Sequence, residues 1–138
     1  MASFETVIPV RFGDVDYAGI MYYPRFFQNF HAVFEDMFGN RLGVPYMSIL
    51  KDRRIGFPMV KIETSFHQPF RFGDPMRLRI ECTRVGRSSI DFHYRGYNDQ
   101  QLLPSVEARA TVVTVNLDSM KPIAIPLDVL AVLRELHD

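Results

Sequence analysis

Two aspartates, Asp14 and Asp16, lie in a short polar stretch directly before a run of aromatic residues, in the segment RFGDVDYAGIMYYP. Pro24 closes this segment and suits the first position of a helix, because that position does not need a backbone N–H. The first turn of a helix has free N–H groups and a partial positive charge, which can hold an anion or a polarised carbonyl oxygen. Asp16 precedes this turn across Gly19, which can bend the chain back or let a substrate approach closely. The segment therefore favours acyl transfer, in which Asp16 attacks a carbonyl or activates water and the helix start stabilises the oxyanion.

The same residues also have structural interpretations. Asp16 could simply bond its own backbone in a turn, as Asp residues often do, and we expect Asp14 to be structural. The side chains of Tyr22 and Tyr23 could pack in the core, whereas a role for Tyr23 at a helix start would use its backbone N–H. His31 lies at the edge of an apolar helix face, where packing or an interface is the expected role.

The remaining histidines and the single cysteine do not form a recognisable metal motif. His67 and His93 show no metal-ligand spacing with Cys82, so we expect no metal. Cys82 alternates with the buried side of a predicted strand and has no paired histidine signal, so it is expected to be an inert core thiol.

The composition restricts the class of protein. The 138 residues, 47% of them hydrophobic, suit one folded domain over 1–138 and argue against disorder. Lys and Arg balance Asp and Glu, 16 to 16, so nothing suggests a nucleic-acid partner. One cysteine excludes an internal disulfide framework. The N-terminus does not read as a secretory signal and no apolar run is long enough for a bilayer, so we expect a cytoplasmic protein without a membrane partner.

The central helix is the clearest predicted element. Apolar residues recur at helical spacing from Arg25 to Phe38, and Gly39 and Asn40 read as its stop signal. The pattern therefore predicts a helix over 24–38 with one wide phenylalanine face. The other predicted non-sheet or edge elements are a first strand within 4–12, a short helix within 44–52 and a C-terminal helix after Pro126.

After residue 56 the apolar pattern changes from helical spacing to strict alternation, which predicts half-buried strands. Several of these runs are long, and long antiparallel strands twist and curl, so the sheet is expected to wrap around the helix at 24–38 in an α+β fold. The tetrapeptide RFGD occurs at 11–14 and 71–74; the second copy is predicted to be a turn, and two short copies do not make an internal repeat. The predicted strands contain Val60–Phe66, Met76–Cys82, Ile90–Tyr94 and Val106–Val112.

Several motifs together resemble a known family. They are D-x-D-x-x-G-I-x-Y-Y-P at 14–24, L-G-V-P at 42–45, G-F-P at 56–58 and the S-F pair at 65–66. The chain resembles the hotdog-fold acyl-CoA thioesterases, most closely the 4-hydroxybenzoyl-CoA thioesterase family, over nearly its whole length. The resemblance implies a sheet wrapped around one long helix and subunits that pair their sheets. It also implies a homodimer or a homotetramer built as a dimer of dimers, with the active site at the subunit interface.

The resemblance also implies roles for residues of the opening segment. Asp16 takes the place of the catalytic carboxylate, and Tyr23 takes the place of the residue whose backbone N–H polarises the thioester carbonyl. Asp14 takes the place of a turn-shaping acid, and Gly19 and Tyr22 are expected at the substrate. Related bacterial acyl-CoA thioesterases have His at the position of Tyr23, so the tyrosine points toward the aryl-CoA branch.

The resemblance places the rest of the substrate on other segments. Coenzyme A enters as part of the substrate, not as a cofactor. Its phosphates need cations, and the family has basic residues around the turn that here reads T-R-V-G-R-S-S, residues 83–89. Tyr46 and Phe57 match positions that line the acyl pocket. The candidate CoA-binding residues are Arg84, Arg87, Ser88 and Ser89.

Three functions are compatible with this sequence. The first is hydrolysis of an acyl-CoA, of 4-hydroxybenzoyl-CoA or another aryl or short acyl group, to free acid and CoA. The second is a non-catalytic hotdog protein that binds acyl-CoA or an acyl carrier, which the fold alone would permit. The third is a dehydratase acting on 3-hydroxyacyl thioesters, which would need a catalytic histidine such as His31 or His67 brought in by the fold.

Overall fold

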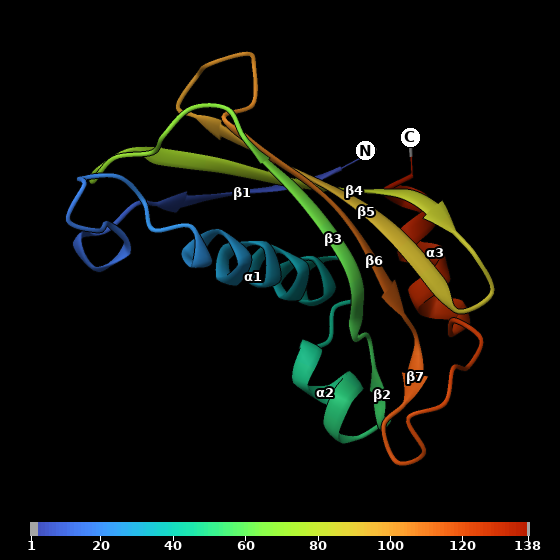
Figure 1. The fold of residues 1–138 in the computed structure, drawn as a ribbon. Coiled ribbons are helices and arrows are strands. Elements are labelled where there is room, and N and C mark those ends of the chain that lie inside the picture. Colours follow the sequence, from blue (N-terminus) through green and yellow to red (C-terminus); the bar gives the residue numbers. More distant parts are fainter. Residues whose placement is uncertain (1–2, 138) are drawn as a thin grey trace.

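A computed structural model describes residues 3–137 of the chain as a curled antiparallel sheet around one long helix (Figure 1). The main sheet has five strands in the order β1-β4-β5-β6-β3, and β2 and β7 form a separate two-stranded sheet. In chain order the elements are β1 (Phe4–Pro9), a 3-10 turn η1 (Phe12–Asp14), α1 (Pro24–Arg41), α2 (Tyr46–Lys51), β2 (Ile55–Gly56), β3 (Met59–Phe66), β4 (Pro75–Val85), β5 (Ser89–Asn98), β6 (Val106–Val113), β7 (Val115–Asn116) and α3 (Leu127–Glu135).

The core lies between α1 and the concave face of the sheet. Alternate residues of β4, β5 and β6 point inward, and the register places Ile80, Tyr94 and Ala108 side by side across the three strands. These inward residues are buried against the aromatic face of α1, where Phe30 stacks on Tyr94 with 4.9 Å between ring centroids. The predicted wrapping of a curled sheet around this helix is confirmed.

Helix α1 begins at Pro24 as predicted but ends three residues later than predicted. Gly39 and Asn40 remain helical, and the last turn closes when the Leu42 N–H donates to the Phe38 carbonyl. The residue that leaves the helix is Gly43, whose φ of +74° lies in the left-handed region that glycine adopts without strain. The prediction was wrong because Gly39 lacks that backbone conformation and simply continues the helix.

The predicted N-terminal edge strand, short second helix and C-terminal helix are all present as β1, α2 and α3. Strand β1 pairs with β4 alone and so forms one edge of the sheet. Helix α3 is held against β4 where the Cys82 N–H donates to the Leu136 carbonyl at 3.0 Å. Within residues 3–137, no helix combines the length and the apolar character needed to cross a membrane.

Strand β3 differs from the prediction because it is mostly exposed, not half-buried. It is the last strand of the sheet and pairs with β6 alone. Val60 is 61% exposed and Phe66 is 50% exposed, and Met59 is also exposed. An edge strand with unpaired backbone groups and exposed apolar side chains is unusual on a monomer, because such an edge readily pairs with another chain.

The two RFGD copies make the same Asp-to-backbone hydrogen bond and lie against each other, but only the second has a glycine with positive φ, Gly73 at +92°. In the first, the Arg11 N–H donates to Asp14 Oδ2 at 2.9 Å; in the second, the Arg71 N–H donates to Asp74 Oδ2 at 2.8 Å. Val10 exchanges backbone hydrogen bonds with the second turn. The prediction of a turn at 71–74 is therefore confirmed.

The convex face of the sheet carries a charged network that the sequence pattern did not reveal. His93 is only 3% exposed on this face. Its Nδ1 lies 3.3 Å from a Glu81 carboxylate oxygen and its Nε2 lies 3.2 Å from a Glu107 carboxylate oxygen. Arg95 contacts the same Glu81 oxygen at 2.8 Å. The network pairs polar groups that would be costly to bury unpaired. His93 therefore has a structural role.

The packing of α1 predicts the cost of emptying the core. Met37 is fully buried between α1 and the sheet, whereas Asp36 beside it is exposed. Met37→Ala should lower the free energy of unfolding by about 2–5 kcal/mol, through lost burial and the cavity left behind. Urea unfolding followed by circular dichroism measures this, with Asp36→Ala as the control. Equal effects of the two changes would contradict this packing.

Candidate functional site

Residues 14–22 form a small hairpin that positions Asp16. The Asp16 N–H donates to the Ile20 carbonyl at 3.0 Å, and an isolated bridge pairs Val15 with Met21. Gly19 closes the turn with φ at +83° and donates its N–H to the Asp16 carbonyl. Its expected role in bending the chain is met by this backbone conformation.

One oxygen of the Asp16 carboxylate bonds the turn, and the other is free. Its Oδ1 accepts the Ala18 N–H at 2.8 Å, as in an Asx turn. No residue within 3–137 hydrogen-bonds to its Oδ2, and the side chain is exposed on the single chain. The turn thus fixes the carboxylate in place while one oxygen stays available for chemistry.

Asp14 serves the backbone. One of its carboxylate oxygens accepts the Arg11 N–H, and its carbonyl accepts the Tyr22 N–H at 2.7 Å. Arg25 approaches the other carboxylate oxygen at 3.9 Å. These bonds hold the start of the hairpin next to the start of α1, as expected for an acid that shapes a turn.

The start of α1 supplies a free backbone donor. Tyr23 is the N-cap, and no side chain caps the helix. The Arg25 N–H donates to the Tyr22 carbonyl and Pro24 has no N–H, while the Tyr23 N–H has no acceptor among the described residues. Tyr22 is 48% exposed and Tyr23 is 61% exposed, so these side chains are not core. The structure therefore provides a donor at a helix N-terminus, where the helix dipole favours a developing negative charge.

A hollow of about 360 Å³ lies beside this donor. It is mostly apolar and is lined by Tyr23 and Phe26 from α1 and by Phe66 at the end of β3. His67 also lines it, and its Nε2 lies 2.9 Å from Glu107 Oε2. No spacing in the sequence signals this placement, because His67 reaches the hollow only through the turn after β3.

Tyr46 and Phe57 meet at a different cavity, of about 490 Å³, between α1, α2 and the start of β3. Phe57 and Phe38 stack with 5.4 Å between centroids, and Tyr46 packs edge-on against Phe34 at 5.4 Å. Burial, with a smaller effect of Glu35, raises the pKa of Tyr46 to about 12, so this phenol stays protonated at neutral pH. The structure thus brings the two predicted acyl-pocket residues together.

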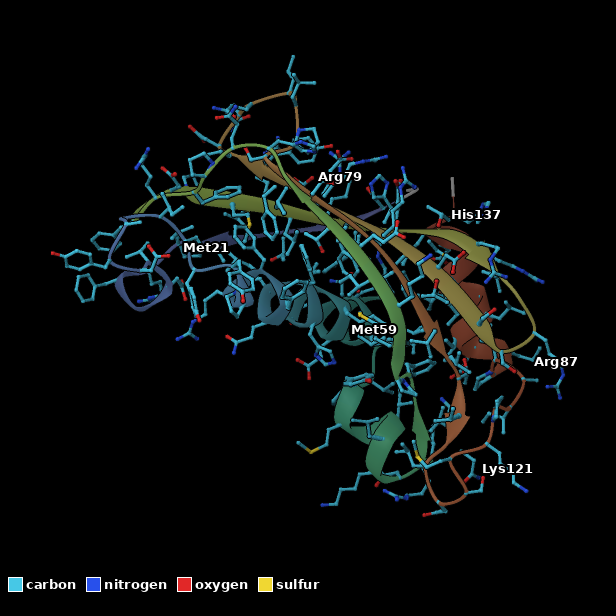
Figure 2. The ribbon with its side chains drawn as sticks, in the orientation of Figure 1. Met21, Met59, Arg79, Arg87, Lys121 and His137 are labelled. Carbon is cyan, nitrogen blue, oxygen red and sulfur yellow. The ribbon has the colours of Figure 1, made fainter. Side chains whose placement is uncertain are left out.

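The turn predicted to bind CoA phosphates lies away from the helix start. Figure 2 shows Met21, in the hairpin with Asp16, and Arg87 on opposite sides of the molecule. Arg84 is already engaged, because its guanidinium contacts Asp91 at 2.8 Å and Ser89 Oγ at 2.9 Å. Ser88 uses its carbonyl to accept the Thr114 N–H. One chain therefore does not bring this turn and Asp16 into a single site.

His31 and Cys82 have structural contacts. His31 is exposed on α1, with Nδ1 3.5 Å from Glu35. Cys82 is fully buried, and burial raises the pKa of its thiol to about 11. The predicted inert core thiol is confirmed.

A curled antiparallel sheet wrapped around one long helix is the hotdog fold. The sequence profile of the thioesterase-like superfamily matches residues 10–133, which include the hairpin, α1 and every strand except β1. The chain therefore belongs to the thioesterase-like superfamily.

Similar proteins agree with this assignment. A 1,4-dihydroxy-2-naphthoyl-CoA hydrolase from Synechococcus elongatus is 28% identical over 118 residues, which cover 85% of this chain and 82% of that protein. The structure of a 1,4-dihydroxy-2-naphthoyl-CoA thioesterase from Synechocystis matches with a TM-score of 0.88 at 19% identity, over 97% of each chain. A gentisyl-coenzyme A thioesterase structure matches with a TM-score of 0.80 at 26% identity, over 92% of this chain and 99% of that one.

The backbone of the hairpin gives a testable prediction. Gly19→Ala should lower the free energy of unfolding by about 1–2 kcal/mol, because a side chain in the left-handed region is strained. A Cβ at Gly19 would meet no neighbouring atom, so strain alone is tested. Gly13→Ala is the control, because Gly13 has equal space and no positive φ. Equal unfolding midpoints for the two variants would contradict the strained turn.

Proposed function

We propose that this protein hydrolyses an acyl-CoA thioester to a free acid and CoA, with Asp16 as the catalytic carboxylate and the Tyr23 N–H as the oxyanion donor. One observation carries this proposal. The hairpin holds the Asp16 carboxylate by one oxygen and leaves the other free, and it leads directly into a helix start whose first N–H has no partner. Carboxylate and oxyanion donor are the two groups that acyl transfer requires.

The chemistry can follow either of two routes. As a general base, Asp16 takes a proton from water while the water oxygen attacks the carbonyl carbon. As a nucleophile, Asp16 Oδ2 attacks the carbonyl itself, and water then hydrolyses the resulting anhydride. In both routes the Tyr23 N–H stabilises the negative carbonyl oxygen, the C–S bond breaks, and the thiolate of CoA leaves and gains a proton.

The aromatic cavity suits the acyl group. Tyr46 and Phe57 line it, with Phe27 at the end nearer the helix start. The similar proteins include a 1,4-dihydroxy-2-naphthoyl-CoA hydrolase and a gentisyl-coenzyme A thioesterase, which supports an aryl acyl group, either 4-hydroxybenzoyl or another. Because the cavity walls are aromatic, stacking and edge contacts with an aryl ring are available.

A second copy of the chain would complete the site. Strand β3 presents an unpaired edge with exposed Met59, Val60 and Phe66. Antiparallel pairing of two β3 edges across a twofold axis puts the Phe66 end of one strand opposite the Met59 end of the other. The hollow beside Tyr23 borders Phe66, and the acyl cavity borders Met59. A dimer of this kind therefore places the helix start of one subunit against the cavity of its partner.

The phosphates of CoA would then meet a turn from another subunit in a dimer or in a dimer of dimers. Arg87 has an exposed side chain at the tip of the β4–β5 turn, and Ser88 and Ser89 add hydroxyl donors there. Arg84 could contribute only by exchanging its Asp91 contact for a phosphate.

A second candidate reaction is dehydration of a 3-hydroxyacyl thioester. The position of His67 favours it, since this imidazole lines the hollow beside Tyr23 and is held by Glu107. A dehydratase would use such a histidine to take a proton next to the carbonyl.

Hydrolysis should depend on the Asp16 carboxylate. Thiol release from a panel of aromatic and aliphatic acyl-CoAs should be seen with the wild type and should fall at least about a hundredfold in Asp16→Asn, which keeps the shape and removes the base. Asp52→Asn is the matched control, because Asp52 is exposed and its carboxylate has no bond among the described residues.

Other outcomes distinguish the alternatives. Turnover that Asp16→Asn leaves unchanged would mean that Asp16 only shapes the turn. Binding of acyl-CoA with no turnover by the wild type would favour a non-catalytic binding protein. Loss of water from a 3-hydroxyacyl-CoA without thiol release, abolished by His67→Gln, would favour the dehydratase.

Assembly of the subunits should depend on the β3 edge. Val60→Glu should convert a wild-type dimer or tetramer into smaller species in light scattering, because a charge would be buried at the strand pair. Leu102→Glu is the control, since Leu102 is exposed on the β5–β6 loop and is not part of a strand. Assemblies unchanged by Val60→Glu, or equally disrupted by Leu102→Glu, would rule out pairing through β3.

A further inference from the structure

Tyr94 has a hydroxyl that the fold does not use. It lies in the middle of β5 on the concave face, between Ile80 of β4 and Ala108 of β6. The residue is only 1% exposed, and its ring stacks on Phe30. The stacked ring accounts for an aromatic side chain here, and a phenylalanine would pack in the same way.

No described residue donates to or accepts from the Tyr94 hydroxyl. Buried hydroxyls almost always have a partner, because leaving one unpaired costs free energy. Burial raises the pKa of Tyr94, so the group is a neutral phenol that can donate one hydrogen bond and accept another. A hydroxyl that has no partner among the described residues and belongs to a residue lining a cavity points to a ligand.

Tyr94 lines the aromatic cavity that also contains Tyr46 and Phe57. Apart from the phenol of Tyr46, most of the lining is apolar, from Phe27, Phe30 and other apolar side chains. His31 borders it as well, but its ring already contacts Glu35. Lys, Arg, Asp and Glu are absent from the described lining of the cavity, so a charged ligand group would be unpaired there.

We propose that Tyr94 determines acyl specificity, by hydrogen-bonding a neutral polar substituent, such as a hydroxyl, on the acyl group that occupies this cavity. This inference rests on the proposed hydrolysis of an acyl-CoA and names the feature of the substrate that the enzyme selects. An acyl group without such a substituent leaves the phenol unpaired in the complex, and that penalty produces the selectivity. A carboxylate or ammonium substituent is rejected because the cavity offers no opposite charge.

The test uses substrate pairs that differ by one hydroxyl. Benzoyl-CoA is compared with 4-hydroxybenzoyl-CoA, and 2-naphthoyl-CoA with 6-hydroxy-2-naphthoyl-CoA, by thiol release. Wild type should have the higher kcat/KM for the hydroxylated member of at least one pair. Tyr94→Phe should reduce that preference about 3- to 10-fold, the effect of one neutral hydrogen bond. The loss should be mostly in KM, because the contact is remote from the reacting carbonyl.

Tyr97→Phe is the matched control. Tyr97 lies on the same strand but faces the convex side, where its ring contacts Arg77 and Arg79. It should leave the substrate preference unchanged. Tyr94→Phe should also unfold at no lower temperature than the wild type, because the hydroxyl that it removes has no partner in the protein. A destabilised Tyr94→Phe would show that the hydroxyl has a structural bond and would overturn the proposal.

Binding of the free acids gives a readout that does not depend on turnover. Fluorescence titration with 6-hydroxy-2-naphthoate and 2-naphthoate should show the same selectivity, weakened in Tyr94→Phe. Hydrolysis that depends on Asp16 but shows no Tyr94-dependent preference would overturn the role of Tyr94 and leave the thioesterase proposal intact. Selective binding that depends on Tyr94, with no hydrolysis of any acyl-CoA, would support the role of Tyr94 and overturn the hydrolase.

Discussion

The packing of the aromatic face of α1 into the curl of the sheet is the contact on which the rest of the structure depends. Phe30 and the other inward aromatic residues of α1 are too large to be covered by a flat sheet, so long strands bend around them. This contact fixes where α1 begins, and therefore where its first N–H points. The chemistry proposed for the hairpin at 14–22 depends on the core because the core holds the start of α1 in place.

The same packing leaves one side of the molecule incomplete. The curl covers α1 with β1, β4, β5 and β6, while β3 ends the sheet with its apolar side chains exposed. Both hollows of the proposed site border this strand, one at each end. The proposed division of the site between two subunits rests on this geometry, because neither end of β3 has on its own chain both the helix start and the acyl cavity.

The polar groups discussed above fall into two sets: those paired within the protein and those left without a protein partner. On the convex face, His93 and the carboxylates around it satisfy one another and stabilise the sheet. Before α1 and in the aromatic cavity, the free oxygen of Asp16, the Tyr23 N–H and the Tyr94 hydroxyl have no partners among residues 3–137. Polar groups left without partners inside or beside a cavity are the ones that a substrate can use.

The sequence by itself determined the local elements, because helical and alternating apolar spacing are short-range signals. It located the start of α1 at Pro24, the turn at 71–74 and the C-terminal helix. It also singled out Asp16 and Tyr23, since a D-x-D turn before a helix is a contiguous motif. The end of α1 was missed because Gly39 and Gly43 look alike in sequence, and only the backbone of the folded chain shows which one takes a positive φ.

Only the tertiary structure decided which distant residues share a cavity. Tyr94 joins Tyr46 and Phe57 through the curl of β5 over α1, and His67 reaches Tyr23 through the turn after β3. The structure likewise separated the turn at 84–89 from Asp16 and showed β3 to be exposed. Burial and proximity depend on how the sheet bends, and no local pattern in a single chain encodes the direction of that bend.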